Sequence, residues 1–164
     1  MADLHVALVA PEIHWNTGNA GRTCLAAGAQ LHLIRPLGFS LDDKQVRRAG
    51  LDYWPRVQPV VWLDWASFEA ALPRLGAPSF FGPRTARQFQ SVAYPRPCVL
   101  IFGCESVGLP DEILARHASE TVEIPMQDPA LRSLNLSTCV ALAAYEVRRQ
   151  WDAAAISGPA GPGR

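Results

Sequence analysis

The stretch CVLIFGCESVGLPDEILARH, residues 98–117, contains a strand, a loop and a helix in direct succession. The apolar run CVLIFG is typical of a buried strand, and PDEILARH, with acidic residues at its start, is typical of a helix. Gly103 and Gly108 bracket the loop between them. Glycine permits a sharp turn and lets a ligand lie directly against the backbone. The stretch therefore predicts one strand–loop–helix unit with a candidate binding loop.

The same alternation of apolar runs and helical stretches continues in both directions along the chain. Strands are predicted at residues 4–10, 30–36, 56–63, 79–82, 98–103 and 121–126. Helices are predicted at residues 19–28, 42–50, 64–76 and 110–117, and a last helix follows Asn135. We therefore expect one α/β domain over residues 1–156, with a mostly parallel sheet flanked by helices. Residues 157–164, SGPAGPGR, are expected to form a flexible C-terminal tail.

Composition and charge narrow the class of protein. The 164 residues are 49% hydrophobic and 18% charged, as expected for a globular domain. Fifteen basic and fifteen acidic residues balance, so a nucleic-acid partner would need a local basic surface. The four cysteines are far apart, which predicts buried free thiols and no metal site. No apolar run is long enough for a signal peptide or a membrane helix, so we expect a cytoplasmic protein without membrane contact.

Ligands of parallel sheets bind beyond the carboxyl ends of the strands, so the loops at those ends are the candidate sites. The first loop, PEIHWNTGNAGR (11–22), has two interpretations. It is a capped helix start with Asn16 or Asn19 as the cap, or it is an anion site. The second interpretation follows from Arg22, because a cation in the first turn of the predicted helix would oppose the helix dipole. The second loop, with Glu105, lacks the lysine of a P-loop, which disfavours a nucleotide phosphate site.

The third loop, PMQDPALRSLNLS (125–137), leads into the last helix through an unusual number of small polar residues. These are Ser133, Asn135, Ser137 and Thr138. Capping a helix needs only one or two of them, so the others indicate a binding site. The helix itself is apolar on nearly all sides, and such a helix is buried on most of its faces. In so small a chain, this pattern predicts packing against a second subunit as well as against the core.

Three segments together resemble the motifs of a known superfamily: PEIHWNTGNAGR, FGCESVGLP and IPMQDPALRSLNLSTCVALAAYE, with PLGFSLDDKQVRRAGLDYW between the first two. They resemble the SPOUT superfamily of S-adenosylmethionine-dependent RNA methyltransferases and are most like its tRNA wobble-ribose 2'-O-methyltransferases of the TrmL type. The resemblance covers about residues 4–151. It implies a SPOUT-type fold with a C-terminal deep trefoil knot and a homodimer. It also implies methyl transfer from S-adenosylmethionine to the 2'-hydroxyl of cytidine or uridine 34 of tRNA.

The resemblance also implies roles for particular residues. By motif position, the cofactor is expected to contact Phe81, Gly103, Gly108, Ile124, Met126, Ser133 and Leu134. The expected catalytic residues are Arg22, Asn16, Glu105, Ser133, Asn135 and Tyr145. We expect Arg22 to bind the flanking phosphate and to polarise the 2'-hydroxyl, since a guanidinium is a poor base at neutral pH. Tyr145 has a second interpretation, as an aromatic side chain in a dimer interface.

The chain departs from the family pattern at three positions. His14 and Trp15 stand where relatives often carry prolines, and Val107 replaces a residue that is often basic. Trp15 could stack on an unpaired RNA base, or it could simply pack against the protein. Phosphate contacts could come from Lys44, Arg47, Arg48, Arg84, Arg87 and Arg132. Three alternatives stay open: 2'-O-methylation of another tRNA position or of ribosomal RNA, a non-catalytic RNA-binding module of this fold, and a nucleotide-binding regulator.

Overall fold

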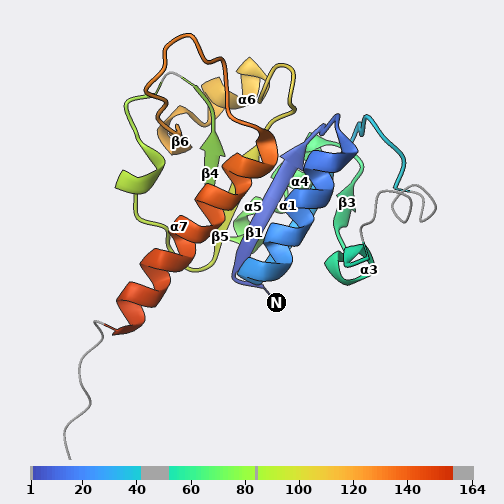
Figure 1. Cartoon of the computed structure of the whole chain (residues 1–164), viewed down its shortest axis with the longest axis horizontal. Helices are drawn as coiled ribbons and strands as arrows, with labels where there is room; N and C mark the ends of the chain where they lie inside the picture. The colour runs from blue at the N-terminus through green and yellow to red at the C-terminus, as the bar shows by residue number, and fades with distance from the viewer. Residues whose placement is uncertain (1, 42–51, 84, 157–164) are drawn as a thin grey trace, which may run out of the picture.

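A computed structural model describes residues 2–41, 52–83 and 85–156, which form one parallel sheet with helices on both faces (Figure 1). The strands lie in the order β3-β2-β1-β5-β4-β6, and every paired neighbour is parallel. Their bounds are β1 Leu4–Val9, β2 Ala29–Ile34, β3 Val60–Trp62, β4 Ala77–Phe81, β5 Cys98–Phe102 and β6 Thr121–Val122. The helices are α1 His14–Ala27, α3 Trp54–Val57, α4 Trp65–Glu69, α5 Leu72–Leu75, α6 Asp111–Arg116 and α7 Leu136–Ile156. Two short 3-10 helices occupy Phe89–Ser91 and Ala118–Glu120. The parallel α/β sheet confirms the predicted fold class, and the knot stays a prediction.

The two faces of β1 explain how the helices are divided between the layers. Successive strand residues point to opposite faces of a sheet. Leu4, Val6 and Leu8 share one core with the buried residues of α1 and α7, whereas Ala7 and Val9 share another with the layer of α4, α5 and α6. In Figure 1, α1 and α7 lie side by side across the same face of the sheet. Every residue of β1 and β5 is buried, as expected for central strands covered on both faces.

The predicted strand at residues 56–63 is wrong over its first part. Trp54–Val57 forms α3, and only Val60–Trp62 pairs with β2. Trp54 and Val57 are buried against α1, where Gly21 leaves room for them. This tertiary contact outweighs the apolar and β-branched character of the segment. The strand predicted at 121–126 is likewise shorter, because β6 ends at Val122.

Two helices and the burial of two cysteines also differ from the predictions. The helix predicted at 64–76 is two short helices, α4 and α5, interrupted at Ala70 and Ala71. The first long helix begins at His14 and not at residue 19, so Asn16 lies inside α1. Cys104 and Cys139 are only partly buried, whereas Cys24 and Cys98 are buried as predicted. The predicted helix 42–50 and the tail 157–164 lie outside the described residues.

A buried chain of hydrogen bonds joins His5 on β1, His32 on β2 and Trp62 on β3. The Trp62 Nε1–H donates to His32 Nδ1 at 3.0 Å, and His32 Nε2 lies 2.9 Å from His5 Nδ1. Because the indole N–H can only donate, His32 is neutral with its proton on Nε2, which donates to His5. Burial lowers the pKa of His32 to about 4, with the neighbouring His5 as a smaller cause, and it lowers the pKa of His5 as well.

We expect the buried hydrogen bonds of His5, His32 and Trp62 to make the stability of the fold sensitive to mild acid. In the unfolded chain His32 binds a proton below about pH 6.5, whereas in the fold it stays neutral down to about pH 4. The contribution of neutral His32 to the free energy of unfolding is therefore complete above pH 6.5, and about 3 kcal/mol of it is lost as the pH falls to 4. Urea unfolding at pH 7.0, 5.5 and 4.5 measures this slope. The His32→Gln variant, whose amide can accept from Trp62 and donate to His5, should have a flatter slope, and an unchanged slope would contradict the assignment.

Candidate functional site

The loops that follow β1 and β5 are tied together by two carboxylates. Glu105 accepts hydrogen bonds from the backbone N–H groups of Glu12 (2.8 Å) and Ile13 (3.2 Å). In return, the Glu12 carboxylate accepts from the backbone N–H (2.9 Å) and the hydroxyl (2.8 Å) of Ser106. Ile13 is the N-cap of α1 and provides no side-chain cap, so Glu105 takes over that role from another loop. Ser106 was not among the residues predicted from the sequence, and no specific role was predicted for Glu12.

Asn16 connects this pair of loops to the start of α7. Its Nδ2–H donates to Glu105 Oε1 at 3.0 Å, and its Oδ1 accepts from Asn135 Nδ2 at 2.9 Å. Asn16 is 7% exposed, so its amide is satisfied almost entirely by these partners. Asn135, directly before α7, in turn accepts from the backbone N–H (2.9 Å) and hydroxyl (2.7 Å) of Ser137, so Asn135 caps the start of α7. The three predicted loops therefore meet at Asn16, and we call Glu105, Asn16 and Asn135 the polar cluster.

The glycines of the second loop fold it into a tight turn. Cys104 and Gly108 exchange backbone hydrogen bonds of 3.2 and 3.0 Å, and Gly108 has φ +77°. A Cβ on Gly103 would lie 1.9 Å from the carbonyl carbon of Gly108. The turn therefore lies directly against the end of β5, which only a glycine at position 103 permits.

The remaining residues predicted to contact the cofactor border this edge of the sheet. Phe81, at the end of β4, stacks on Phe102 of β5 with ring centroids 4.4 Å apart. Ile124 and Leu134 are partly buried, whereas Met126 and Ser133 are exposed. Among the described residues, no hydrogen bond joins Ser133 to the polar cluster. The segment 123–135 between β6 and α7 has neither helix nor regular strand.

Arg22 is not part of the polar cluster within one chain. It lies in the third turn of α1, so the expected conflict with the helix dipole is wrong. Its guanidinium lies 4.7 Å from the centroid of the Tyr53 ring, and Tyr53 donates a hydrogen bond to the Gly18 carbonyl at 3.0 Å. The side chain is exposed and shares one stripe of α1 with Trp15, Asn19 and Ala26.

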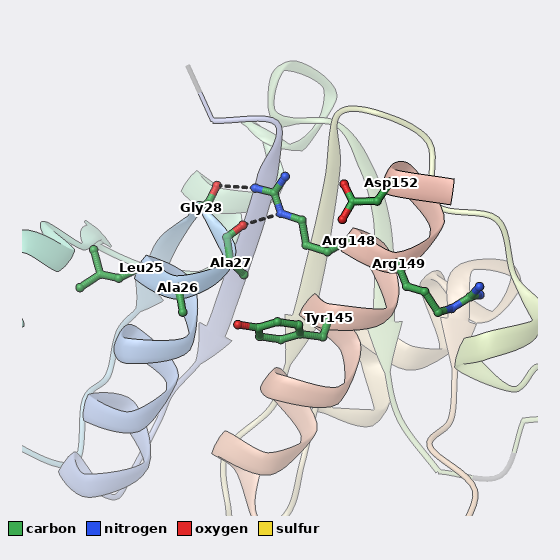
Figure 2. A pocket seen from close by; sticks show the side chains of 8 residues that line it. All are labelled: Leu25, Ala26, Ala27, Gly28, Tyr145, Arg148, Arg149 and Asp152. Atoms are coloured by element: carbon green, nitrogen blue, oxygen red, sulfur yellow. Dashed lines mark hydrogen bonds between the residues drawn. The ribbon is translucent and has the colours of Figure 1, made fainter. Parts of the chain in front are cut away.

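Tyr145 also lies away from the polar cluster, in an open hollow of about 620 Å³ between the end of α1 and α7. Figure 2 shows its ring extending from α7 toward α1. Arg148 forms one side of this hollow and donates to the carbonyls of Ala27 (2.5 Å) and Gly28 (3.3 Å), which caps the end of α1. Tyr145 is 54% exposed, and Ala26 of the Arg22 stripe lines the same hollow.

The predicted phosphate contacts are only partly described. Arg87 and Arg132 are exposed, whereas Lys44, Arg47, Arg48 and Arg84 lie outside the described residues. Within the described ranges, no three His, Cys, Asp or Glu side chains are placed to hold a metal ion. No described helix is both long enough and apolar enough to cross a membrane.

Comparison with known proteins agrees with this geometry. Residues 3–145 match the model of the SpoU rRNA Methylase family. A relative from Burkholderia cenocepacia, named tRNA (cytidine(34)-2'-O)-methyltransferase, is 48% identical over 148 residues, which are 89% of this chain and 94% of the relative. A solved structure described as structural insights into the 2-OH methylation of C/U34 on tRNA is 46% identical, with a TM-score of 0.84 over 92% of this chain and 97% of that one.

A more distant structure adds a bound cofactor. The AdoMet-bound rRNA methyltransferase from Sinorhizobium meliloti is 27% identical, with a TM-score of 0.72 over 90% of this chain and 56% of that one. The matched family model spans most of the sequence and includes the loops that converge on Asn16. The chain belongs to the SpoU rRNA methylase family.

Proposed function

We propose that the protein transfers a methyl group from S-adenosylmethionine to the ribose 2'-hydroxyl of nucleotide 34, cytidine or uridine, in tRNA. The observation that carries the proposal is the polar cluster, which joins the motif loops at the carboxyl edge of the sheet. The names of relatives that are 47% and 48% identical over 89% of this chain support the same substrate. Because this substrate is cytoplasmic tRNA, we propose that the enzyme acts in the cytoplasm.

The edge of the sheet beside the polar cluster fits a nucleoside cofactor. The partly exposed ring of Phe81, stacked on the buried Phe102, offers an apolar surface, and the partly exposed Gly108 presents backbone without a side chain. Binding would involve Phe81, Gly103, Gly108, Ile124, Met126, Ser133 and Leu134. When bound, S-adenosylmethionine supplies an electrophilic methyl group on its sulfonium sulfur.

In the proposed reaction, the protein positions the ribose and stabilises the oxygen as its proton leaves. The 2'-oxygen would take the methyl group, which would leave S-adenosylhomocysteine as the thioether product, and the hydroxyl proton would pass to solvent water. Orientation of this kind contributes several kcal/mol, up to roughly 10. Arg22 binds the flanking phosphate and polarises the 2'-hydroxyl, while Asn16, Glu105 and Asn135 fix the loops around the site. Ser133 is close enough in sequence to Asn135 to orient the ribose or cofactor.

We infer that the active form is a homodimer in which a second copy covers the exposed face of α1 and α7. Leu142 is 42% and Tyr145 is 54% exposed, although the opposite side of α7 is buried in the core. Arg22 lies roughly 9 Å along α1 from Asn16, six residues away, and on a different side of the helix. In the proposed dimer, the reaction site forms where the polar cluster of one copy meets Arg22 of the other. Tyr145 then lies at the interface.

The activity is tested by incubating the purified protein with labelled S-adenosylmethionine and total tRNA, followed by nucleoside mapping. We expect label in 2'-O-methylcytidine or 2'-O-methyluridine at position 34. Because the matched family model is described as an rRNA methylase, ribosomal RNA is the second substrate to test. Label found only in ribosomal RNA or at another tRNA position would replace the proposed substrate. Cofactor binding without transfer to any RNA would favour a non-catalytic RNA-binding module.

A charge on the exposed face of α7 should separate the proposed dimer. We expect the Leu142→Asp variant to weaken self-association by at least about 100-fold, because the carboxylate would be buried without a partner. Sedimentation velocity over a range of concentrations measures the dissociation constant. Leu63→Asp is the matched control, since Leu63 is exposed beside the edge strand β3, away from this face. Equal association of the two variants would place the interface elsewhere.

A further inference from the structure

An exposed group of aromatic side chains borders the polar cluster. His14 and Trp15 form the first turn of α1, with ring centroids 4.4 Å apart and planes inclined by 38°. Phe39, which follows β2 and is partly buried, has its ring centroid 6.5 Å from that of His14. Trp15 is nevertheless 51% exposed, so about half of its surface is open to solvent. We call His14, Trp15 and Phe39 the aromatic platform.

The backbone fixes this platform before any ligand binds. The loops after β1 and β2 are joined by a hydrogen bond from the Gly38 N–H to the Pro11 carbonyl at 2.9 Å. Gly38 lies so close to Glu12 that a Cβ at position 38 would meet its carbonyl oxygen at 2.6 Å. The Glu12 and Glu105 bonds hold the other side of the same loop. An indole held on a fixed backbone and packed on a neighbouring ring binds a flat partner at a lower entropic cost than a freely moving one would.

The surroundings of the platform suit an RNA strand better than a protein surface. Trp15 and Asn19 are exposed and spaced i and i+4, so an aromatic ring and an amide follow one another along the start of α1. Arg35 is exposed at the carboxyl end of the neighbouring β2. Aromatic side chains interleaved with cations bind single-stranded nucleic acid, because bases stack on the rings and phosphates meet the charges.

We propose that Trp15, whose ring packs on His14, stacks on an unpaired base next to the nucleotide that is methylated. This inference rests on the proposed function, because it uses the same RNA and the same edge of the sheet. Asn16, the next residue of α1, belongs to the polar cluster, so the aromatic platform borders the proposed reaction site. The platform therefore selects RNA loops whose bases are free to leave the stack. It is a substrate-binding element and takes no part in the transfer of the methyl group.

Substitution of Trp15 tests the platform through RNA affinity. Loss of one base–aromatic stack should raise both the KM and the Kd for unmodified tRNA by about 5- to 150-fold in Trp15→Ala. The kcat at saturating tRNA should stay within about twofold, because stacking acts alike on the bound substrate and the transition state. Trp15→Phe should recover most of the affinity, since it restores a ring. Ile156→Ala is the control, because Ile156 is exposed at the end of α7 far from Asn135, and it should leave the KM, the Kd and the kcat unchanged.

An RNA series identifies the stacked base. Anticodon stem-loops with a single abasic nucleotide at each loop position should include one that weakens binding to the wild type but not to Trp15→Ala. Unchanged tRNA affinity in Trp15→Ala would overturn the proposed stacking role. So would a series in which every abasic nucleotide weakens binding to Trp15→Ala as much as it weakens binding to the wild type. Weaker self-association of Trp15→Ala that accounts for its lost affinity would also overturn it, in favour of a subunit contact. A wild-type protein that binds tRNA without methylating nucleotide 34 would instead contradict the proposed function, and the Kd comparison would still test the platform.

Discussion

The Arg22→Ala variant is expected to lose about 10²- to 10⁴-fold in kcat for methyl transfer to tRNA. This range is typical when a group that assists removal of a proton or stabilises the developing charge is deleted. The affinity for S-adenosylmethionine should change little, because Arg22 is exposed on α1 and does not contact the cofactor loops within its own chain. Single-turnover transfer with saturating tRNA and cofactor measures the chemical step, and calorimetry measures cofactor binding.

Two comparisons separate a chemical role of Arg22 from a structural one. Arg22→Lys keeps the charge but not the planar set of donors, so it should recover only part of the rate. The contact with the Tyr53 ring is worth roughly 0.5–1 kcal/mol, so the melting temperature of Arg22→Ala should fall by only a few degrees. Near-normal transfer by Arg22→Ala would remove Arg22 from the mechanism.

The sheet could be predicted from the sequence because its central strands are buried on both faces. Buried strands require continuous apolar runs, and 4–10 and 98–103 are such runs bounded by turn residues. The errors lie where a tertiary contact decides the conformation. Residues 56–57 are helical because α3 packs on Gly21 of α1, and no local pattern carries that information. The start of α1 at His14 depends on Glu105, which is 92 residues away from Ile13.

The part of the candidate site that could be predicted to come together within one chain is the part formed by the motif loops. Asn16, Glu105 and Asn135 each follow a strand or precede a helix at the same edge of the sheet, and the structure joins them by hydrogen bonds. Arg22 and Tyr145 lie on a face that one chain leaves exposed. The spacing of residues within one chain cannot indicate a contact that needs two copies. Ser106 escaped prediction because a serine among loop residues has no distinctive signal until its partner Glu12 is placed.

The Gly103→Ala variant is expected to lose at least about 3 kcal/mol of stability, and its affinity for the cofactor should also fall sharply. Its new methyl group would lie 1.9 Å from the Gly108 carbonyl carbon and 2.1 Å from the Leu109 nitrogen. Backbone cannot yield as a flexible side chain does, so the turn between Cys104 and Gly108 must open or move away from β5. Urea unfolding measures the stability, and calorimetry with S-adenosylhomocysteine should show affinity lower by 100-fold or more.

Gly108→Ala is the matched control for this argument, because it adds the same methyl group five residues further along the same loop. No atom lies within 4 Å of a Cβ at position 108, so its cost comes only from the φ of +77°. A left-handed conformation costs an alanine about 1–2 kcal/mol, and the backbone of the turn can stay in place. Gly108→Ala should therefore fold and lose only this amount, about 1–2 kcal/mol, in urea unfolding. If the two variants lost equal stability, the close approach of the turn to the end of β5 would not be what makes Gly103 necessary.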